Sequence, residues 1–423
     1  MVRIDYKWVR AQFPTLEEPN ENGFSFFDNA GGTFPCRQSN YILFKFYNDY
    51  KMQPYGATKN QAEAGRLMDE GRRKIAELLG LKISDLTYGA STTQNFNTLA
   101  ISLLGHIEQD DEIIVTMQDH EANIGAWERL AKQKDAKLIL IEVELDGELD
   151  LSHFKSCLSH KTKIVSFTHS SNIIGTVNDV NKIGKMIKEQ CPHEPLVIVD
   201  GVSYAPHMLP DITALDVDAY CFSTYKTFGV HMGLMFTSEK INRLATPQCH
   251  FFNIDKPNYS IFDAAGPDHA SIASLAGIAD YYQEFAIHHG MNDNGDLNDA
   301  RKYASEIMHE AETELLKDLL ALIRRKNVRV YGKERVEGRE ANISFTVYGM
   351  DSKDVIEALA QKNIGAKYGH FYAYRLLEAL GIKDLEDGVV RISYAHYLNK
   401  ADNERLLGVL SDILPNTKSL ALV

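Results

Sequence analysis

Residues 196–226 read LVIVDGVSYAPHMLPDITALDVDAYCFSTYK, and this stretch decides the fold. It opens with four apolar, mostly β-branched residues, which is typical of a buried strand, and the run ends directly on Asp200. A second strand-like run, residues 219–222, ends on Ser223-Thr224-Tyr225-Lys226. In open α/β sheets, ligands gather outside the carboxyl ends of the strands. The stretch therefore predicts one site that contains both Asp200 and Lys226.

An acid and a lysine at two strand ends are the pair that a pyridoxal phosphate enzyme needs. A lysine amine can form a Schiff base with a carbonyl cofactor, and a carboxylate can partner the pyridinium nitrogen of this cofactor. Many strands end in aspartate and lysines are common, so the pair alone leaves a purely structural role open for both residues.

The flanking sequence alternates between strand-like and helix-like patterns. Strands are predicted at residues 86–88, 112–116, 137–143, 164–168 and 233–237, and helices at 60–79, 93–104, 123–133 and 181–190. This alternation predicts an α/β fold with a mainly parallel sheet and right-handed crossovers, in which residues 233–237 close the sheet.

The pattern changes near residue 292. A long charged helix (299–325) precedes strands at 328–331, 342–347 and 389–394 and helices at 352–362 and 372–380. We expect an N-terminal segment (1–22) that packs on a small α+β domain (292–423), and a large domain (23–291) that carries the cofactor.

Composition excludes several classes of protein. The chain of 423 residues has a formal net charge of −13 and no Lys/Arg run, which argues against a nucleic-acid-binding face. Its five cysteines lack any CxxC spacing, which indicates reduced thiols and neither a zinc site nor a disulfide framework. No signal-like or membrane-length apolar run is present. We expect a soluble, cytoplasmic protein without a metal.

Three polar turns, each between a strand and a helix, are further candidates for the site. Thr92 and Thr93 open a helix, where backbone N–H groups and hydroxyls can bind phosphate, although threonines also cap helices routinely. His120 can stack on a planar ring or be a solvated histidine. Asn172 can contact a ring hydroxyl or form a turn.

Together these pieces resemble the class V aminotransferases, which are pyridoxal phosphate enzymes of fold type I, and especially their cysteine-desulfurase-like branch. The matching segments follow the order and spacing of the family from about residue 24 to residue 410. They are FFDNAGGTFP, YGASTTQNFN, DEIIVTMQDHEANIGAW, SSNIIGTVNDV, LVIVDGVSYAPH, DVDAYCFSTYKTFG and GVVRISYAHY.

The resemblance implies a role for each matching residue. Lys226 would bind the cofactor covalently and shuttle protons, Asp200 would keep the pyridine nitrogen protonated, and His120 would stack on the ring. Arg391 would bind the substrate α-carboxylate through its planar fork. The other residues implied for the cofactor are Asn172, Thr92, Thr93, Ser203, Ser223 and Tyr225, and those for the substrate are Asn29, His370 and Tyr372. Relatives are homodimers, so a homodimer is expected.

The chain departs from the family at three positions. Ser203 stands where many members have glutamine, and Gly266 stands where a threonine of the partner subunit reaches the phosphate in relatives. Tyr372 occupies the loop position of the nucleophilic cysteine of true desulfurases. A phenol cannot accept sulfur as a persulfide, so desulfuration by that route is excluded.

These observations favour a β-eliminating C–S lyase that acts on a cysteine-like or sulfur-substituted amino acid. Desulfination or decarboxylation with carbon–carbon bond formation, epimerisation and transamination stay open within the same family. A catalytically silent scaffold is a remote alternative, which intact Lys226, Asp200, His120 and Arg391 argue against.

Overall fold

A seven-stranded sheet forms the centre of the computed structural model, which describes residues 2–16, 23–254, 256, 260–264, 266 and 268–416. The sheet has the order β2-β8-β7-β6-β5-β3-β4 and is parallel from β7 to β4. Its strands are β2 (Leu86–Gly89), β3 (Glu112–Thr116), β4 (Lys137–Ile141), β5 (Thr162–Thr168), β6 (Leu196–Asp200), β7 (Ala219–Ser223) and β8 (Gly233–Thr237). The expected mainly parallel α/β architecture is confirmed.

Strand β8 does not close the sheet at an edge, contrary to the expectation. It pairs antiparallel with β7 on one side and with β2 on the other. The earlier strand β2 therefore takes the edge position, with β8 between it and the parallel strands.

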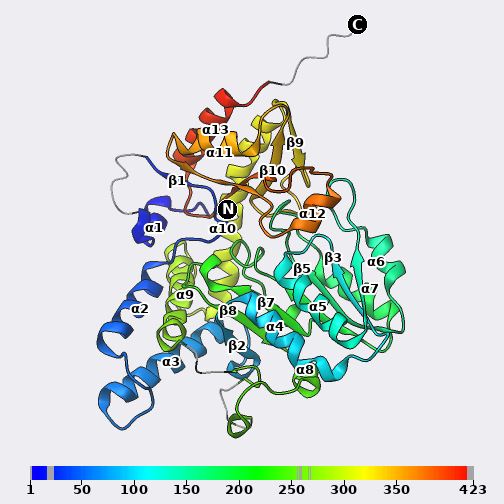
Figure 1. The fold of residues 1–423 in the computed structure, drawn as a ribbon. Coiled ribbons are helices and arrows are strands. Elements are labelled where there is room, and N and C mark those ends of the chain that lie inside the picture. The colour runs from blue at the N-terminus through cyan, green and yellow to red at the C-terminus, as the bar shows by residue number, and fades with distance from the viewer. Residues whose placement is uncertain are drawn as a thin grey trace.

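Both faces of this sheet are buried, as the apolar composition of its strands requires. Within β6, Leu196 and Ile198 belong to one core cluster, while Val197 and Val199 belong to the other. Figure 1 shows helices on both sides of the sheet. The α-helices between residues 37 and 288 are α2 (Arg37–Asp49), α3 (Lys59–Leu78), α4 (Thr92–Ser102), α5 (Glu121–Lys134), α6 (Leu151–Cys157), α7 (Val180–Gln190), α8 (Glu239–Leu244) and α9 (His269–His288).

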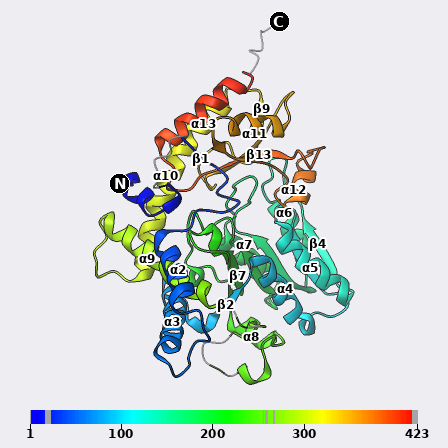
Figure 2. The same ribbon diagram turned by 60° about the vertical axis from the view of Figure 1, so that its left-hand side comes forward.

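A second, four-stranded antiparallel sheet lies at the opposite end of the molecule from α3 and α8 (Figure 2). Its order is β12-β13-β10-β9, and β1 and β11 form a separate short pair that joins it through a bridge between Asp28 and Ser393. The elements are β1 (Ser25–Phe26), α10 (Leu297–Ile323), β9 (Val328–Tyr331), β10 (Asn342–Val347), α11 (Ser352–Ala360), β11 (Ile364–Gly365), β12 (Lys367–Gly369), α12 (Tyr374–Ala379), β13 (Val389–Ser393) and α13 (Lys400–Ile413).

The N-terminal helix α1 (Tyr6–Ala11) contacts both α13 and α9. The Arg10 guanidinium lies 2.8 Å from the Asp402 carboxylate near the start of α13. The Trp8 ring stacks on His288 at the end of α9, with centroids 4.5 Å apart. The domain boundaries at residues 22 and 291 stay a prediction, and residues 1, 17–22 and 417–423 of these segments lie outside the described part.

In the described part of the chain, every helix is too short or too polar to cross a membrane.

Candidate active site

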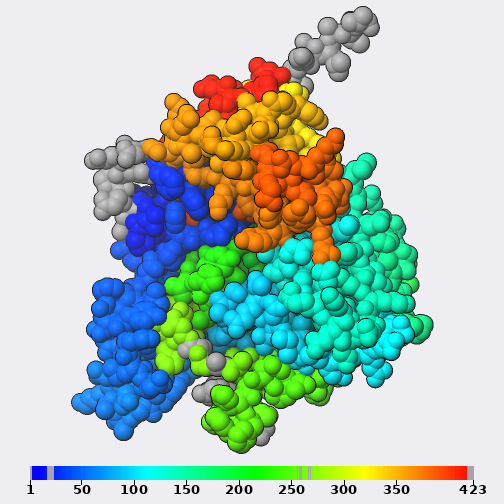
Figure 3. Space-filling model, in the orientation of Figure 1, coloured from blue at the N-terminus to red at the C-terminus, as the bar shows by residue number. Residues whose placement is uncertain are grey.

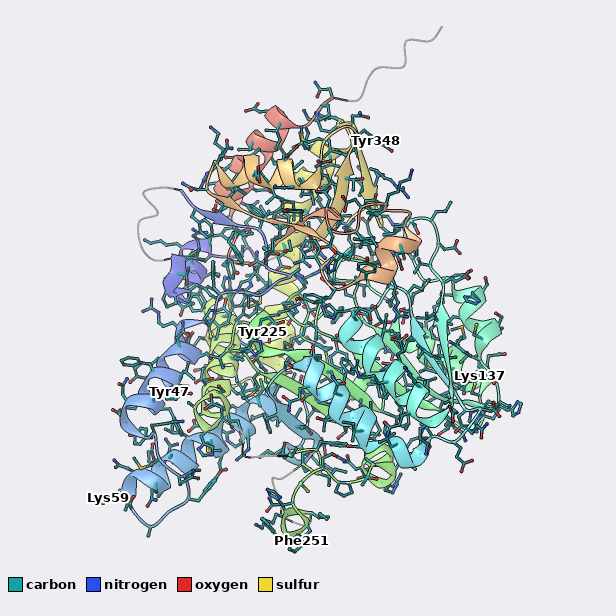
Figure 4. The ribbon with its side chains drawn as sticks, viewed as in Figure 1. Tyr47, Lys59, Lys137, Tyr225, Phe251 and Tyr348 are labelled. Atoms are coloured by element: carbon teal, nitrogen blue, oxygen red, sulfur yellow. The ribbon has the colours of Figure 1, made fainter. Side chains whose placement is uncertain are left out.

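The strand ends of the large sheet bring the predicted cofactor residues together in one pocket. Strands β6 and β7 are parallel neighbours, so Asp200 at the end of β6 comes close to the segment that follows β7. This segment is a 3₁₀ turn, Thr224–Lys226. Tyr225 accordingly lies near the centre of the molecule in Figure 4. The lining is made by Ser91, Thr92, Thr93, His120, Ala122, Thr168, Asn172, Asp200, Val202, Ser203, Ser223, Tyr225 and Lys226.

Lys226 is an amine adapted to react near neutral pH. Only 8% of the residue is exposed. Burial lowers the pKa of Lys226 to about 8, and the positive charge of Arg391 acts in the same direction. A substantial share of the amine is therefore neutral, and hence nucleophilic, at physiological pH.

Asp200 provides the negative charge of the pocket. Burial raises its pKa to about 6, while an N–H bond from Val202 to Oδ1 (2.9 Å) and the Lys226 charge favour the carboxylate. The backbone of Asp200 is held too, because its carbonyl accepts a hydrogen bond from the His169 N–H at 2.8 Å. A positively charged ring nitrogen in the pocket would stabilise the ionised form of Asp200 further.

One end of the pocket is suited to a phosphate. Ser91 caps α4 by accepting the Gln94 N–H at 3.1 Å, and the first N–H groups of a helix have no intrahelical partner. The hydroxyls of Thr92 and Ser223 lie 2.7 Å apart, one from the helix and one from β7. Gly233 on β8 is packed tightly beneath this turn, where a Cβ atom would come within 2.4 Å of the Ser91 backbone carbon.

His120 is held in a defined orientation at the start of α5. Its Nδ1 accepts the Ala122 N–H at 3.0 Å, so the neutral ring carries its proton on Nε2. Burial lowers the pKa of His120 to about 3, and the charge of Lys226 adds to this effect. A neutral imidazole is the form that can lie flat against an aromatic ring without adding charge.

A loop that follows β12 of the second sheet lies next to the pocket, and it contains His370, Phe371 and Tyr372. Asn172 donates its side-chain N–H to the Phe371 carbonyl at 2.9 Å, and the Glu121 N–H donates to the Tyr372 carbonyl at 2.8 Å. Phe371 and Tyr372 both have positive φ angles, 48° and 59°. Two successive residues in this region are costly without glycine, and such strain is often found at functional sites.

Ion pairs fix the same loop to the large sheet region. Arg375 of α12 lies 2.8 Å from Glu121 and 3.0 Å from Glu128, both on α5. In Figure 3 the residues around α12, drawn in orange, pack directly against the cyan residues of this region.

Arg391 lies on β13 and is 3% exposed. Its Nη2 lies 2.8 Å from Oδ1 of Asp28, and its Nη1 donates to the Asn172 carbonyl at 3.2 Å. The Phe371 ring covers the guanidinium at 3.7 Å from its centroid.

Four residues that the resemblance assigned to the substrate do not line the pocket: Arg391, Asn29, His370 and Tyr372. The Asn29 amide is fully engaged, because its nitrogen donates to the Phe26 and Ser393 carbonyls (2.9 Å each) and its oxygen accepts from the Tyr397 hydroxyl. Asn29 therefore holds a turn in this structure.

Sequence reasoning missed Asp28, Phe371 and Lys367, which surround Arg391. The signal for Asp28 was its place beside Asn29 in the Gly-rich turn. Nothing in the sequence revealed that Phe371 would cover the guanidinium.

Comparisons with known proteins agree with this geometry. The sequence profile described as "Aminotransferase class-V" matches residues 25–406. "Aminotransferase-like protein FGM3" of Gibberella zeae is 32% identical over 419 residues, which are 96% of this chain and 98% of that protein. The chain belongs to the class V aminotransferase family.

Within this family, the chain is similar to proteins of the cysteine desulfurase kind. "Cysteine desulfurase-like protein ustD" of Aspergillus flavus is 28% identical over 408 residues, covering 93% of this chain and 87% of that protein. The structure of an apo cysteine desulfurase from Thermococcus onnurineus NA1 has the same fold, with a TM-score of 0.84 at 22% identity over 98% of this chain and 99% of that chain.

Enzymes of this family depend on pyridoxal 5'-phosphate, and the chain is an enzyme of this kind. The pocket fits the cofactor: a buried amine of lowered pKa and a buried carboxylate lie at adjacent strand ends, and hydroxyls gather at a helix N-terminus. When bound, the cofactor withdraws electrons from bonds at the amino-acid α-carbon.

Proposed function

We propose that this enzyme is a β-eliminating C–S lyase that acts on a cysteine-like or sulfur-substituted amino acid. Lys226, with a pKa of about 8, is suited to remove the α-proton, and the β-substituent then leaves with its bonding electrons. Thiolate is a good leaving group of this type.

Each residue of the pocket has a part in this proposal. Lys226 holds the cofactor and moves the proton at the α-carbon. Asp200 stabilises the protonated ring nitrogen, and the neutral His120 ring orients the cofactor plane. Thr92, Thr93, Ser203, Ser223, Tyr225 and Asn172 position the phosphate and the ring.

The choice of elimination rests on the absence of a cysteine among the described residues at the pocket, since Tyr372 occupies the loop position of the desulfurase cysteine. Tyr372 stands there with 66% of its surface exposed, and none of the five cysteines, all of which are described, lines the pocket. Without a thiol to accept sulfur, the sulfur atom has to leave bound to its original substituent or as free sulfide.

The test is to mix the pyridoxal-phosphate-loaded enzyme with L-cysteine and with an S-alkyl cysteine and to quantify pyruvate, ammonia, alanine and released sulfur. The proposal predicts equal amounts of pyruvate and ammonia over many turnovers. Alanine with released sulfur would instead mean desulfuration and would overturn the role given to Tyr372. Lys226→Ala is the blank and should abolish turnover.

Transamination is the second candidate, because the relative FGM3 is named aminotransferase-like. The same experiment separates the two reactions. A transaminase stops after one keto acid per active site unless a second keto acid accepts the amino group, and it releases no ammonia. An eliminating enzyme needs no acceptor.

We also propose that the protein works as a homodimer in the cytoplasm. The stretch around Gly266, in which Ala265 and Pro267 lie outside the described residues, aligns with the stretch from which a threonine of relatives reaches the phosphate of the other subunit. Light scattering on the loaded enzyme tests the dimer, and a monomer with full activity would refute it.

A further inference from the structure

Two cations face each other across the strands that border the pocket. Strands β12 and β13 are antiparallel, and Lys367 is the direct partner of Arg391 in their register. Directly opposed residues project to the same face of a sheet, and like charges in such a pair are destabilising. A negative charge is therefore needed nearby to offset the repulsion between Lys367 and Arg391.

Asp28 provides that compensation from the Gly-rich turn. Its Oδ1 lies 2.8 Å from Nη2 of Arg391, and its Oδ2 lies 3.9 Å from Nζ of Lys367. The two contacts differ in environment. Arg391 is buried, whereas 70% of the Lys367 side chain is exposed.

Two cations, Arg391 and Lys367, therefore share the single carboxylate of Asp28. In addition, Nε of Arg391 is buried without a hydrogen-bond partner. The Phe371 ring covers one face of the guanidinium, and the N–H donors that bind an anion point outward from the guanidinium edge. The edge already holds Asp28, and an incoming carboxylate has to compete with this residue.

We propose that the substrate carboxylate displaces Asp28 from the guanidinium of Arg391. The displaced Asp28 carboxylate then pairs with Lys367. This inference rests on the proposed function, since it concerns the carboxylate of the amino-acid substrate. A buried guanidinium is costly without a counter-charge, so Asp28 stabilises the site before the substrate binds. Two carboxylates around one cation repel each other, and the flexible Lys367 side chain removes this repulsion by pairing with the displaced one.

The alternative is that Asp28 only holds the turn in place, next to its bridge partner Ser393. The two possibilities predict opposite effects of removing its charge. A competitor weakens the binding of an external carboxylate, so its removal strengthens binding. A structural residue positions Arg391, so its removal weakens binding.

The experiment measures acetate binding to the pyridoxal-phosphate-loaded enzyme from the rise of the thermal unfolding midpoint, at constant ionic strength with chloride. We expect Asp28→Asn to bind acetate about tenfold more tightly than the wild type. Lys367→Met should bind it about fivefold more weakly, because the displaced Asp28 has no partner. Lys400→Met, an exposed lysine paired with Glu404 on α13, is the matched control and should equal the wild type.

Equal or weaker binding by Asp28→Asn overturns the proposal. If Asp28→Asn does not fold, the test depends on Lys367→Met alone. An acetate affinity equal to that of the wild type in Lys367→Met overturns the proposal, and a weaker affinity supports it. The measurement involves no turnover. A failure to release pyruvate would therefore refute the lyase function while leaving the acetate result interpretable.

Discussion

The ring of Tyr372 lies against the ring of His120, with centroids 5.2 Å apart and planes tilted by 36°. His120 follows β3 of the large sheet and Tyr372 follows β12 of the second sheet, so the contact joins these two parts of the structure beside the pocket that His120 lines. Tyr372 is also fixed through its backbone, since its carbonyl accepts the Glu121 N–H. Its side chain is thus presented at a defined position while most of it stays exposed.

Substitution of Tyr372 should change substrate preference. Tyr372→Ala removes the ring from the entrance, so we expect discrimination between small and large S-substituents to fall by about tenfold, as for other apolar specificity contacts. Tyr372→Phe keeps the ring and should keep the preference. The measurement is kcat/KM over a panel of S-alkyl cysteines. Tyr348→Ala, exposed and far from the pocket in Figure 4, is the control, and identical profiles for all variants would contradict this role.

Substitution of Gly233 should weaken cofactor binding. A Cβ atom here would come within 2.5 Å of the Thr92 amide nitrogen, and backbone atoms cannot move aside easily. We expect Gly233→Ala to raise the Kd for pyridoxal phosphate at least tenfold by displacing the phosphate-binding turn. Gly184→Ala on α7 has no atom within 4 Å of its new methyl group and should bind the cofactor normally. Equal affinities, measured by absorbance titration, would show that the turn tolerates displacement.

Much of the large sheet could be predicted from sequence because its strands are short, apolar and followed by polar turns. Strand β3 begins and ends where its pattern predicts, and Asp200 and Lys226 lie at adjacent strand ends as expected. Helix α9 was missed for a physical reason. Most of its residues are apolar and buried, on nearly all sides of the helix, so it has little amphipathic period.

The rim of the pocket could not be predicted in the same way. The contact of Arg391 with Asp28 joins residues 363 positions apart and depends on the register of β12 and β13. The hydrophobic and turn patterns of one sequence do not reveal the register between distant strands. The resemblance assigns the substrate carboxylate to Arg391, whereas the contact of Arg391 with Asp28 depends on how distant segments pair.

The pKa of Lys226 sets the pH dependence of cofactor attachment. The amine reacts only when neutral, so the attachment rate should rise about tenfold from pH 6 to 7 and level off above about 8. Arg391 lowers this pKa and Asp200 raises it. Arg391→Met should therefore move the midpoint to higher pH, and Asp200→Asn should move it to lower pH. Stopped-flow absorbance measures the rate, with Lys226→Ala as the blank, and a common midpoint for all variants would contradict the assignment.

A buried ion pair behind the pocket should control stability at alkaline pH. Nδ1 of His207, in the turn after β6, lies 2.6 Å from Oε2 of Glu312 on α10, and the two side chains are 5% and 0% exposed. The nearby charged residues are Glu340 and His309. Burial lowers the pKa of His207, but Glu312 outweighs this effect and the pKa rises to about 9.

Because the folded-state pKa of His207 exceeds its ordinary value of 6.5, its contribution to stability is complete below pH 6.5 and is lost as the pH rises through about 9. Wild-type protein should therefore lose unfolding free energy over this window in urea titrations. His207→Gln should be less stable than the wild type at pH 6, and this difference in unfolding free energy should shrink as the pH rises to 9. Glu312→Gln should cost about 3 kcal/mol at pH 6, because it removes the interaction that raises the pKa of His207. Glu306→Gln, an exposed acid on the same helix, should stay within about 0.5 kcal/mol of the wild type at every pH. A wild-type profile that His207→Gln reproduces in full would assign the alkaline loss to another group.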